Sequence, residues 1–156
     1  MRVFRNHTAT MFRLSMLAAL VFGACVALPA QNCTVTSYGQ GCGPVATGIV
    51  TPNGNTARFD FTVTAAPRSR VLLVVGVNET ATPLPFTSCL LLTELAFTQQ
   101  HRTDAAGQWS FSHAIAGGGT FTGYARIQFI QFDLDSNGGL SLFPSNGLLM
   151  DCGGGS

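Results

Sequence analysis

Apolar and polar residues alternate at every second position in several stretches of this chain, and no long helical period follows the first thirty residues. In "ARFDFTVTA", every second residue from Phe59 to Ala65 is apolar, and the residues between them are polar or charged. In "QWSFSHAI", every second residue from Trp109 to Ile115 falls on one side, with His113 among them. A period of two predicts half-buried strands with one solvent-facing side.

Other stretches are apolar at nearly every position. The stretch "RVLLVVGV", residues 70–77, predicts a strand that is covered on both faces. The stretch "CLLLTELAF" fits either a strand or a short helix, because periodicity does not decide so short a run. The stretches "GLSLF" and "NGLLMDC" predict two last short strands.

The longest apolar stretch, "TFTGYARIQFIQFDLD", changes phase in its middle. Apolar residues up to Phe129 fall on one parity, and those from Ile130 onward fall on the other. A period of two cannot bury both sets on one face. Either a β-bulge near Phe129–Ile130 resets the phase, or the strand is buried on both faces.

Turn signals separate these stretches, among them "TPNGN", "TDAAGQ" and "DSNGG". Short strands at such intervals predict an all-β fold, an antiparallel β-sandwich of the immunoglobulin-like or jelly-roll-like kind. No linker divides the chain. We therefore expect a single domain over residues 31–152 and a flexible tail at 153–156.

The first thirty residues have a different composition. Three arginines precede the uncharged apolar run "LSMLAALVFGACVAL", and the small-residue site "LPAQ" follows it. This order predicts a signal peptide over residues 1–30, with cleavage near Ala30 or alternatively Ala27. The apolar run is shorter than the roughly 20 residues that a membrane span needs. We therefore expect no membrane span.

Two alternatives stay open in this leader. Translation could begin at Met1 or at Met11, because "MFRLSMLAAL" would serve as a leader unaided. The stretch "FGAC" ending at Cys25 resembles a lipoprotein site, but Phe22 stands where leucine is usual. We favour ordinary cleavage, which predicts a protein that is secreted or displayed at the cell surface.

The charge of the mature chain argues against nucleic acids and anionic membranes as partners. Without the three arginines of the leader, five arginines stand against seven Asp and Glu residues, a net charge of −2. There is no lysine, and the nearest approach to a basic cluster is "RSR" at residues 68–70, which we interpret as a solvated turn. Nucleic-acid binders show clustered basic residues, so we expect no nucleic acid and no anionic membrane as partner.

Four cysteines remain once Cys25 leaves with the leader. An even number in an exported chain predicts two disulfides, and the lack of CxxC spacing argues against zinc. Four cysteines allow three pairings, and the sequence alone does not choose among them. We favour Cys33 with Cys152, which ties the two ends of the domain together, and Cys42 with Cys89, which closes an internal loop.

Several motifs follow one another in a fixed order: "SYGQGCG" at 37–43, "FTVT" at 61–64, "RVLLVVGV" at 70–77, "PLPFTSCLLL" at 83–92, "TDAAGQWSFS" at 103–112 and "SNGLLM" at 145–150. This order resembles a family of small secreted bacterial β-rich domains that begin with YGxGC and end with SNGL. The resemblance covers nearly all of the mature chain and implies export, a compact β-rich fold and no known activity. It also implies that Cys42 pairs with Cys89, which leaves Cys33 with Cys152. The chain departs from the family's pattern in its long "QFIQFDLD" strand.

The stretch "FDLDSNGG" contains a candidate calcium site. Asp133, Asp135 and Asn137 lie two residues apart and are followed by glycine, as at the start of an EF-hand loop. The twelfth position is Pro144, which offers no side-chain oxygen, so any Ca²⁺ site would be weak. Asn-Gly between two strands predicts a hairpin turn instead. We favour the turn and expect no resident cofactor.

Catalytic residues are not marked out by the sequence. No GxSxG motif is present, and a loop ion pair with Asp104 is the favoured interpretation of His101. We interpret His113 as a core or boundary histidine because it shares a face with Trp109. Glu79 and Glu94 could in principle form a hydrolase pair, although nothing in their sequence context distinguishes them. We therefore predict a protein that is not an enzyme.

Exposed aromatic rings would suit a sugar-binding face, and the candidates are Tyr38, Trp109 and Tyr124. For Trp109, the alternation favours a core anchor instead. The sequence thus predicts a structural or interaction module of the cell surface or extracellular space, with a surface glycan or protein as partner. A carbohydrate-binding module is the second interpretation, and a weak hydrolase is the third.

Overall fold

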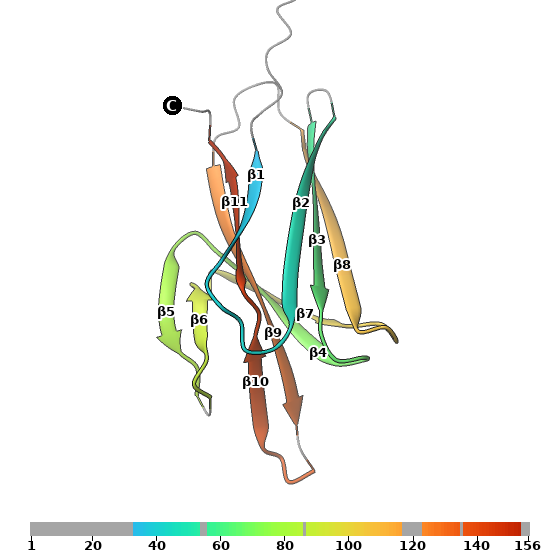
Figure 1. The fold of residues 1–156 in the computed structure, drawn as a ribbon, viewed down its shortest axis with the longest axis vertical. Coiled ribbons are helices and arrows are strands. Elements are labelled where there is room, and N and C mark those ends of the chain that lie inside the picture. The colour runs from blue at the N-terminus through green and yellow to red at the C-terminus, as the bar shows by residue number, and fades with distance from the viewer. Residues whose placement is uncertain (1–32, 54–55, 86, 117–122, 135, 154–156) are drawn as a thin grey trace, which may run out of the picture.

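The computed structural model of the chain describes residues 33–53, 56–85, 87–116, 123–134 and 136–153. These residues form antiparallel strands in two sheets and one separate hairpin (Figure 1). The large sheet consists, in spatial order, of β1 (Thr34–Tyr38), β11 (Gly147–Cys152), β9 (Gly123–Leu134), β4 (Arg70–Gly76) and β7 (Phe97–Arg102), and β10 (Leu140–Pro144) also pairs with β9. The small sheet has the order β2 (Val45–Asn53), β3 (Thr56–Thr64) and β8 (Gln108–Ala116), and the hairpin consists of β5 (Glu79–Pro83) and β6 (Leu90–Thr93). The predicted signal peptide and the end of the predicted tail lie outside the described residues.

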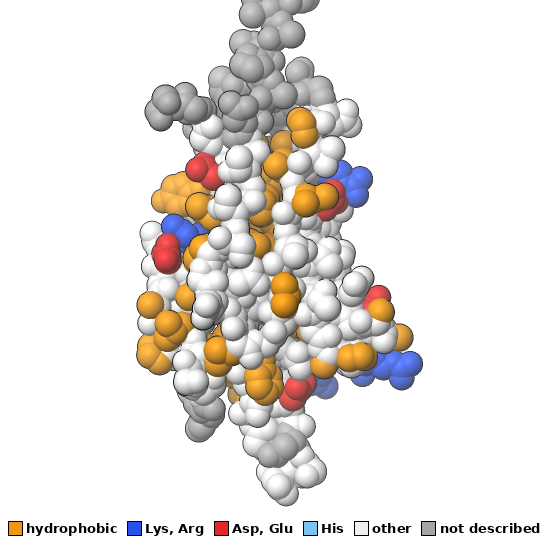
Figure 2. All heavy atoms as spheres, in the orientation of Figure 1, with side chains coloured by type: hydrophobic (Ala, Val, Ile, Leu, Met, Phe, Trp, Pro, Cys, Tyr) orange, Lys and Arg blue, Asp and Glu red, His pale blue; other side chains and the backbone are white. Residues whose placement is uncertain are grey.

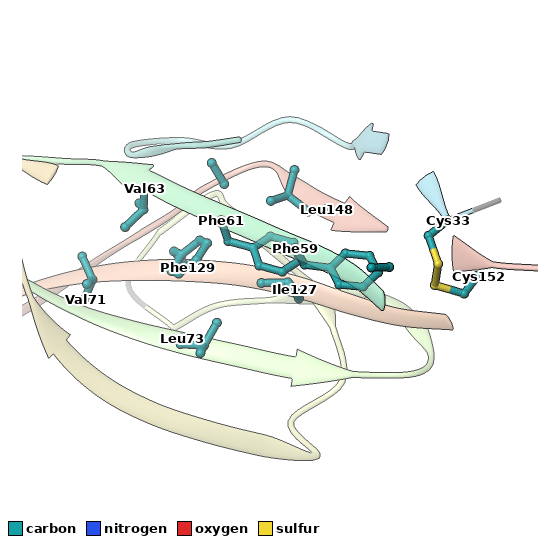
Figure 3. Close-up of a cluster of buried hydrophobic side chains, with 12 residues drawn as sticks. Cys33, Phe59, Phe61, Val63, Val71, Leu73, Ile127, Phe129, Leu148 and Cys152 are labelled. Atoms are coloured by element: carbon teal, nitrogen blue, oxygen red, sulfur yellow. A yellow bond between two sulfur atoms is a disulfide. The ribbon is translucent and has the colours of Figure 1, made fainter. Parts of the chain in front are cut away.

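The two sheets face each other across a hydrophobic core, so the predicted antiparallel β-sandwich is confirmed (Figure 3). Phe59 and Phe61 of β3 point into this core, toward Ile127 and Phe129 of β9. Along β3, buried residues alternate with more exposed ones, as the period of two predicts. Phe59 and Phe129 are both 0% exposed, so the core is closed to solvent at its centre.

Strands β4 and β9 are buried on both faces because the β5–β6 hairpin covers the outer side of the large sheet. Val71 and Phe129 belong to the core between the sheets. Val74 and Ile130 form a second cluster with Leu91 of the hairpin. In Figure 1 the hairpin lies on one side of the large sheet and the small sheet lies on the other. This arrangement confirms the prediction for β4 and explains the two parities along β9.

A register shift lies beside β9 and not within it. The pairing of β9 with β4 runs without interruption, but on the other edge of β9 the register shifts by one residue between β10 and β11. Ser145 still bonds to both backbone groups of Phe129, so the extra residue is Asn146. The side-chain amide of Asn146 accepts from the N–H of Ala46 (2.9 Å) and donates to its C=O (3.0 Å). The extra residue thereby links the large sheet to β2 of the small sheet.

One polar side chain is fully buried on the outer face of the large sheet. Gln128 of β9 is 0% exposed. Its Oε1 accepts a hydrogen bond from the N–H of Leu92 (2.9 Å), and its Nε2 donates to the C=O of Ser145 (2.8 Å) and of Leu90 (3.4 Å). Gln128 therefore bonds to the backbone of β6 as a neighbouring strand would, and it holds the hairpin on the sheet.

Replacing Gln128 with leucine is expected to lower the free energy of unfolding by about 1–3 kcal/mol, because the N–H of Leu92 would stay buried without its acceptor. Denaturant unfolding measures the loss, and native-state hydrogen exchange should show faster exchange at the Leu92 amide. The matched control is Gln100→Leu on the exposed edge strand β7, for which a change within about 0.5 kcal/mol is expected. Equal effects of the two substitutions would contradict the role assigned to Gln128.

Both disulfides have the favoured pairing. Cys33 bonds to Cys152, which joins the start of β1 to the end of β11, its antiparallel neighbour. Cys42 bonds to Cys89, which ties the segment after β1 to the loop between β5 and β6. The first bond therefore ties together the first and last strands within the large sheet, and the second adds a covalent link to the hairpin.

Candidate functional site

The candidate calcium ligands of the disfavoured metal interpretation belong to the β9–β10 connection. Oδ2 of Asp133, at the end of β9, accepts a hydrogen bond from Nε2 of Gln131 (2.9 Å). Asn137 lies in the turn, and Asp135 lies outside the described residues. The predicted hairpin is confirmed by the antiparallel pairing of β9 with β10. Within the ranges that the structure describes, no three His, Cys, Asp or Glu side chains come together as a metal site would require.

His101 has a packing role that the sequence did not indicate. It lies on β7 and stacks on Trp109 of β8, with ring centroids 3.8 Å apart. The predicted ion pair with Asp104 does not form, because Oδ1 of Asp104 accepts from the N–H groups of Ala106 and Gln108 (2.8 Å each). The carboxylate thus closes the turn between β7 and β8.

Trp109 and His113 lie on the same strand, β8, but they differ from each other in burial. Trp109 is half-buried and packs against the core, edge-on to Phe129 with ring centroids 6.0 Å apart, which confirms its interpretation as a core anchor. His113 is exposed, so its interpretation as a core or boundary histidine is wrong. Side chains on the outer strand β8 are covered less than those of the central strand β3, where Phe59, directly opposite His113, is 0% exposed.

Burial lowers the pKa of His101 below its ordinary value of 6.5. The unfolded chain therefore binds this proton more readily, so the contribution to stability is complete above pH 6.5 and is lost as the pH falls through that value. We expect melts between about pH 7.5 and 5.5 to show this loss, with a slope of at most about 1.4 kcal/mol per pH unit. His101→Phe should flatten the slope, and Gln100→Phe on the same strand, which removes no titrating group, is the control that should leave it unchanged. A wild-type slope retained in His101→Phe would refute the assignment.

Tyr38 holds the hairpin and is not an exposed sugar platform. Its hydroxyl bonds to Oγ1 of Thr93 on β6 (2.8 Å), and the guanidinium carbon of Arg126 lies 4.9 Å from its ring centroid. Arg126 in turn pairs with Glu79 of β5 (3.1 Å). Gly147 on the neighbouring strand is required here, because a Cβ at this position would overlap the Tyr38 ring. These contacts join β1, β9 and both hairpin strands.

The three aromatic candidates do not form one face. Trp109 belongs to the small sheet, and the ring of Tyr38 is covered by Arg126. Tyr124 is 55% exposed and lies near the opposite end of β11 from Tyr38. The candidate rings therefore form no common sugar-binding strip within the described residues.

The side chain of Glu94 stabilises the turn that follows β4. Its carboxylate accepts hydrogen bonds from the N–H groups of Val77 and Asn78 and from Nδ2 of Asn78 (2.7 Å). The bonds from Val77 and Asn78 hold the pKa of Glu94 below its ordinary value. Glu79 is engaged by Arg126, so the two glutamates serve separate structural contacts.

A concave depression of about 400 Å³ lies where β4 begins and β9 ends. The last pair between these strands is Arg70 with Phe132, so the two chains diverge beyond it. On the other side of β4, Arg102 of β7 lies directly opposite Arg70. We name this surface the arginine corner; its residues are Arg68, Ser69, Arg70, Arg102, Phe132, Asp133 and Leu134. In Figure 2, blue arginine side chains gather at the lower right with red and orange side chains beside them.

The arginines of the arginine corner lack carboxylate partners, whereas the arginines elsewhere in the described residues form ion pairs. Outside it, Arg58 pairs with Asp60 (2.9 Å) and Arg126 pairs with Glu79. The three arginines of the corner form no ion pair with any carboxylate in the described ranges. Instead, Nε of Arg102 donates to the C=O of Arg68 (2.9 Å). The sequence showed only "RSR", because the third arginine arrives through strand pairing.

Comparisons of this chain with known proteins identify no relative. Along the described stretches, we find no helix with the length and apolar content that a membrane crossing requires. Searches of protein families, of curated proteins and of solved structures give no match to this chain. The resemblance to the domains with the YGxGC and SNGL motifs therefore stays a prediction.

Proposed function

We propose that the protein is a non-enzymatic structural or interaction module, exported to the cell surface or the extracellular space. Its two disulfides support export, because such bonds persist in oxidising compartments. Its net charge of −2 after loss of the leader supports a partner other than nucleic acid or an anionic membrane.

The observation that carries the proposal is the use of the buried polar side chains. Gln128 joins β9 to β6, and Ser145 joins the β10–β11 segment to Phe129. Oγ1 of Thr103 donates to the C=O of Ala66 (2.7 Å) and accepts from the N–H of Ser69 (2.9 Å), which fastens two turns together. An active site instead gathers such groups around a cleft, beside a perturbed acid or base. Here they connect strands and turns, which favours a rigid module over a catalyst.

A binding and turnover screen tests this proposal. The exported, disulfide-bonded protein is applied to arrays of surface glycans and extracellular proteins, and each ligand is analysed for chemical change. We expect saturable binding to one class of ligand, with the ligand recovered intact. Hydrolysis of any ligand in proportion to the protein concentration would show that the protein is an enzyme.

We also propose that the fold holds no resident metal. A weak Ca²⁺ site at Asp133 would stabilise the fold by about 2.7 kcal/mol when Ca²⁺ is 100-fold above its dissociation constant. We expect equal melting temperatures in about 100 mM CaCl₂, roughly a 100-fold excess over a millimolar dissociation constant, and in a chelator. A higher melting temperature in CaCl₂ that disappears in Asp133→Asn would establish the calcium site instead.

A carbohydrate-binding module is the second candidate, and one observation favours it. The arginine corner is an open depression with both charged and apolar walls, which is the mixed lining typical of small-ligand sites.

A further inference from the structure

The charged residues of the arginine corner do not stabilise the sheet. Arg70 and Arg102 are direct cross-strand partners, and like charges at such positions destabilise a sheet. Arg68 lies beside them with a φ of 55°, a left-handed conformation that is unfavourable for residues other than glycine. Neutral residues and glycine would suit this backbone better. Three clustered guanidinium groups therefore indicate an anion from outside the chain.

The walls of the depression narrow the class of anion. Phe132 is half-buried and Leu134 is 62% exposed, so apolar surface adjoins the arginines. Asp133 lines the same depression, and its Oδ2 accepts a hydrogen bond from Nε2 of Gln131. The site thus combines cationic donors, an acceptor and apolar contact area, which suits a ligand with a carboxylate, hydroxyl groups and a flat hydrocarbon face.

We propose that the arginine corner binds carboxylate-bearing sugar units, such as uronates, of an acidic extracellular polysaccharide. This inference rests on the proposed interaction-module function and specifies its ligand. A guanidinium group binds a carboxylate through two parallel charge-assisted hydrogen bonds, a geometry that lysine does not offer. Arg70 and Arg68 hold the carboxylate, Asp133 accepts from a ring hydroxyl, and Phe132 contacts the apolar face of the sugar.

The carboxylate of Asp133 distinguishes this ligand from other anions. A polyglutamate peptide or a phosphate-rich polymer presents dense negative charge and few hydroxyl donors, so Asp133 would repel it. A uronate brings one carboxylate together with several hydroxyl groups. The charge pattern therefore favours the acidic glycan over the acidic peptide.

Calorimetric titration of the exported protein with a galacturonate oligomer tests the site, with a neutral galactose oligomer and a glutamate peptide as comparison ligands. We expect binding to the galacturonate oligomer that weakens as salt screens the arginines. Arg70→Gln should weaken it at least about tenfold, and Arg70→Lys should lie between, because it keeps the charge and loses the fork. The matched control is Arg58→Gln, which removes the same charge beside Asp60 and should change the affinity less than about twofold.

Each outcome supports or overturns the inference. No binding, equal binding of the neutral oligomer, tighter binding of the glutamate peptide, or equal losses in Arg70→Gln and Arg58→Gln would overturn it. Melting curves of all variants exclude unfolding as the cause of a loss. If the site fails while the array screen still yields another intact ligand, the interaction module stands. If the galacturonate oligomer binds and is cleaved, the non-enzymatic function fails and the site stands.

Discussion

Replacing Cys33 and Cys152 together with alanine is expected to lower the free energy of unfolding by about 4–5 kcal/mol. The bond joins residues separated by 119 positions, so it removes much of the conformational freedom of the unfolded chain. Small domains are stable by only about 5–15 kcal/mol in total. Loss of this one bond should therefore bring the domain close to its stability limit.

Equilibrium unfolding in urea under non-oxidising, thiol-free conditions measures the change. The comparison variant replaces Cys42 and Cys89, which are separated by 47 positions, and should cost about 4 kcal/mol by the same reasoning. Because the second bond anchors the β5–β6 hairpin, its loss should also speed hydrogen exchange in β6. A loss below about 1 kcal/mol for the Cys33–Cys152 variant would contradict the chain-entropy account.

Replacing Phe129 with alanine is expected to lower the free energy of unfolding by about 3–5 kcal/mol, because it opens a cavity between the two sheets. Phe129 is 0% exposed, and β9 is held on both edges by paired strands. The surrounding backbone therefore has little freedom to collapse into the cavity.

Phe97→Ala is the matched control for this experiment. Phe97 lies on the edge strand β7 and is 55% exposed, so its loss should cost less than about 1 kcal/mol. Urea unfolding of the two variants with unchanged slopes measures the difference. Similar costs at both positions would mean that the centre of the sandwich is not closely packed.

The strands with strong patterns could be predicted because local hydrophobicity determines which face they bury. β3 alternates and has one solvent-facing side, and β4 is apolar after Arg70 because the hairpin covers its outer side. β7 reads "FTQQHR" and shows no such pattern, because an exposed edge strand needs backbone pairing with β4 and few apolar side chains. β2 could not be predicted from its sequence either, because its glycine, proline and threonine residues interrupt the apolar pattern.

The residues that give the domain its specific contacts could not be predicted, because their roles depend on register. Gln128 interrupts an apolar run and would be placed on the surface by its polarity, yet the backbone of β6 lies within hydrogen-bonding distance. His101 is polar and lies on an edge strand, and only the approach of β8 shows that it stacks on Trp109. The arginine corner joins residues from three separate segments, and their pairing brings them together.

The bond between Cys33 and Cys152 also determines how the domain responds to mechanical load. It lies where the first and last strands meet, so a pull on the chain before Cys33 and after Cys152 passes through the sulfur bridge and bypasses the sheets. The oxidised domain behaves under tension as a short inextensible link. After reduction, the same pull would separate β1 from β11 starting at their tied ends, one residue pair at a time, which is the weakest direction in which to load an antiparallel pair.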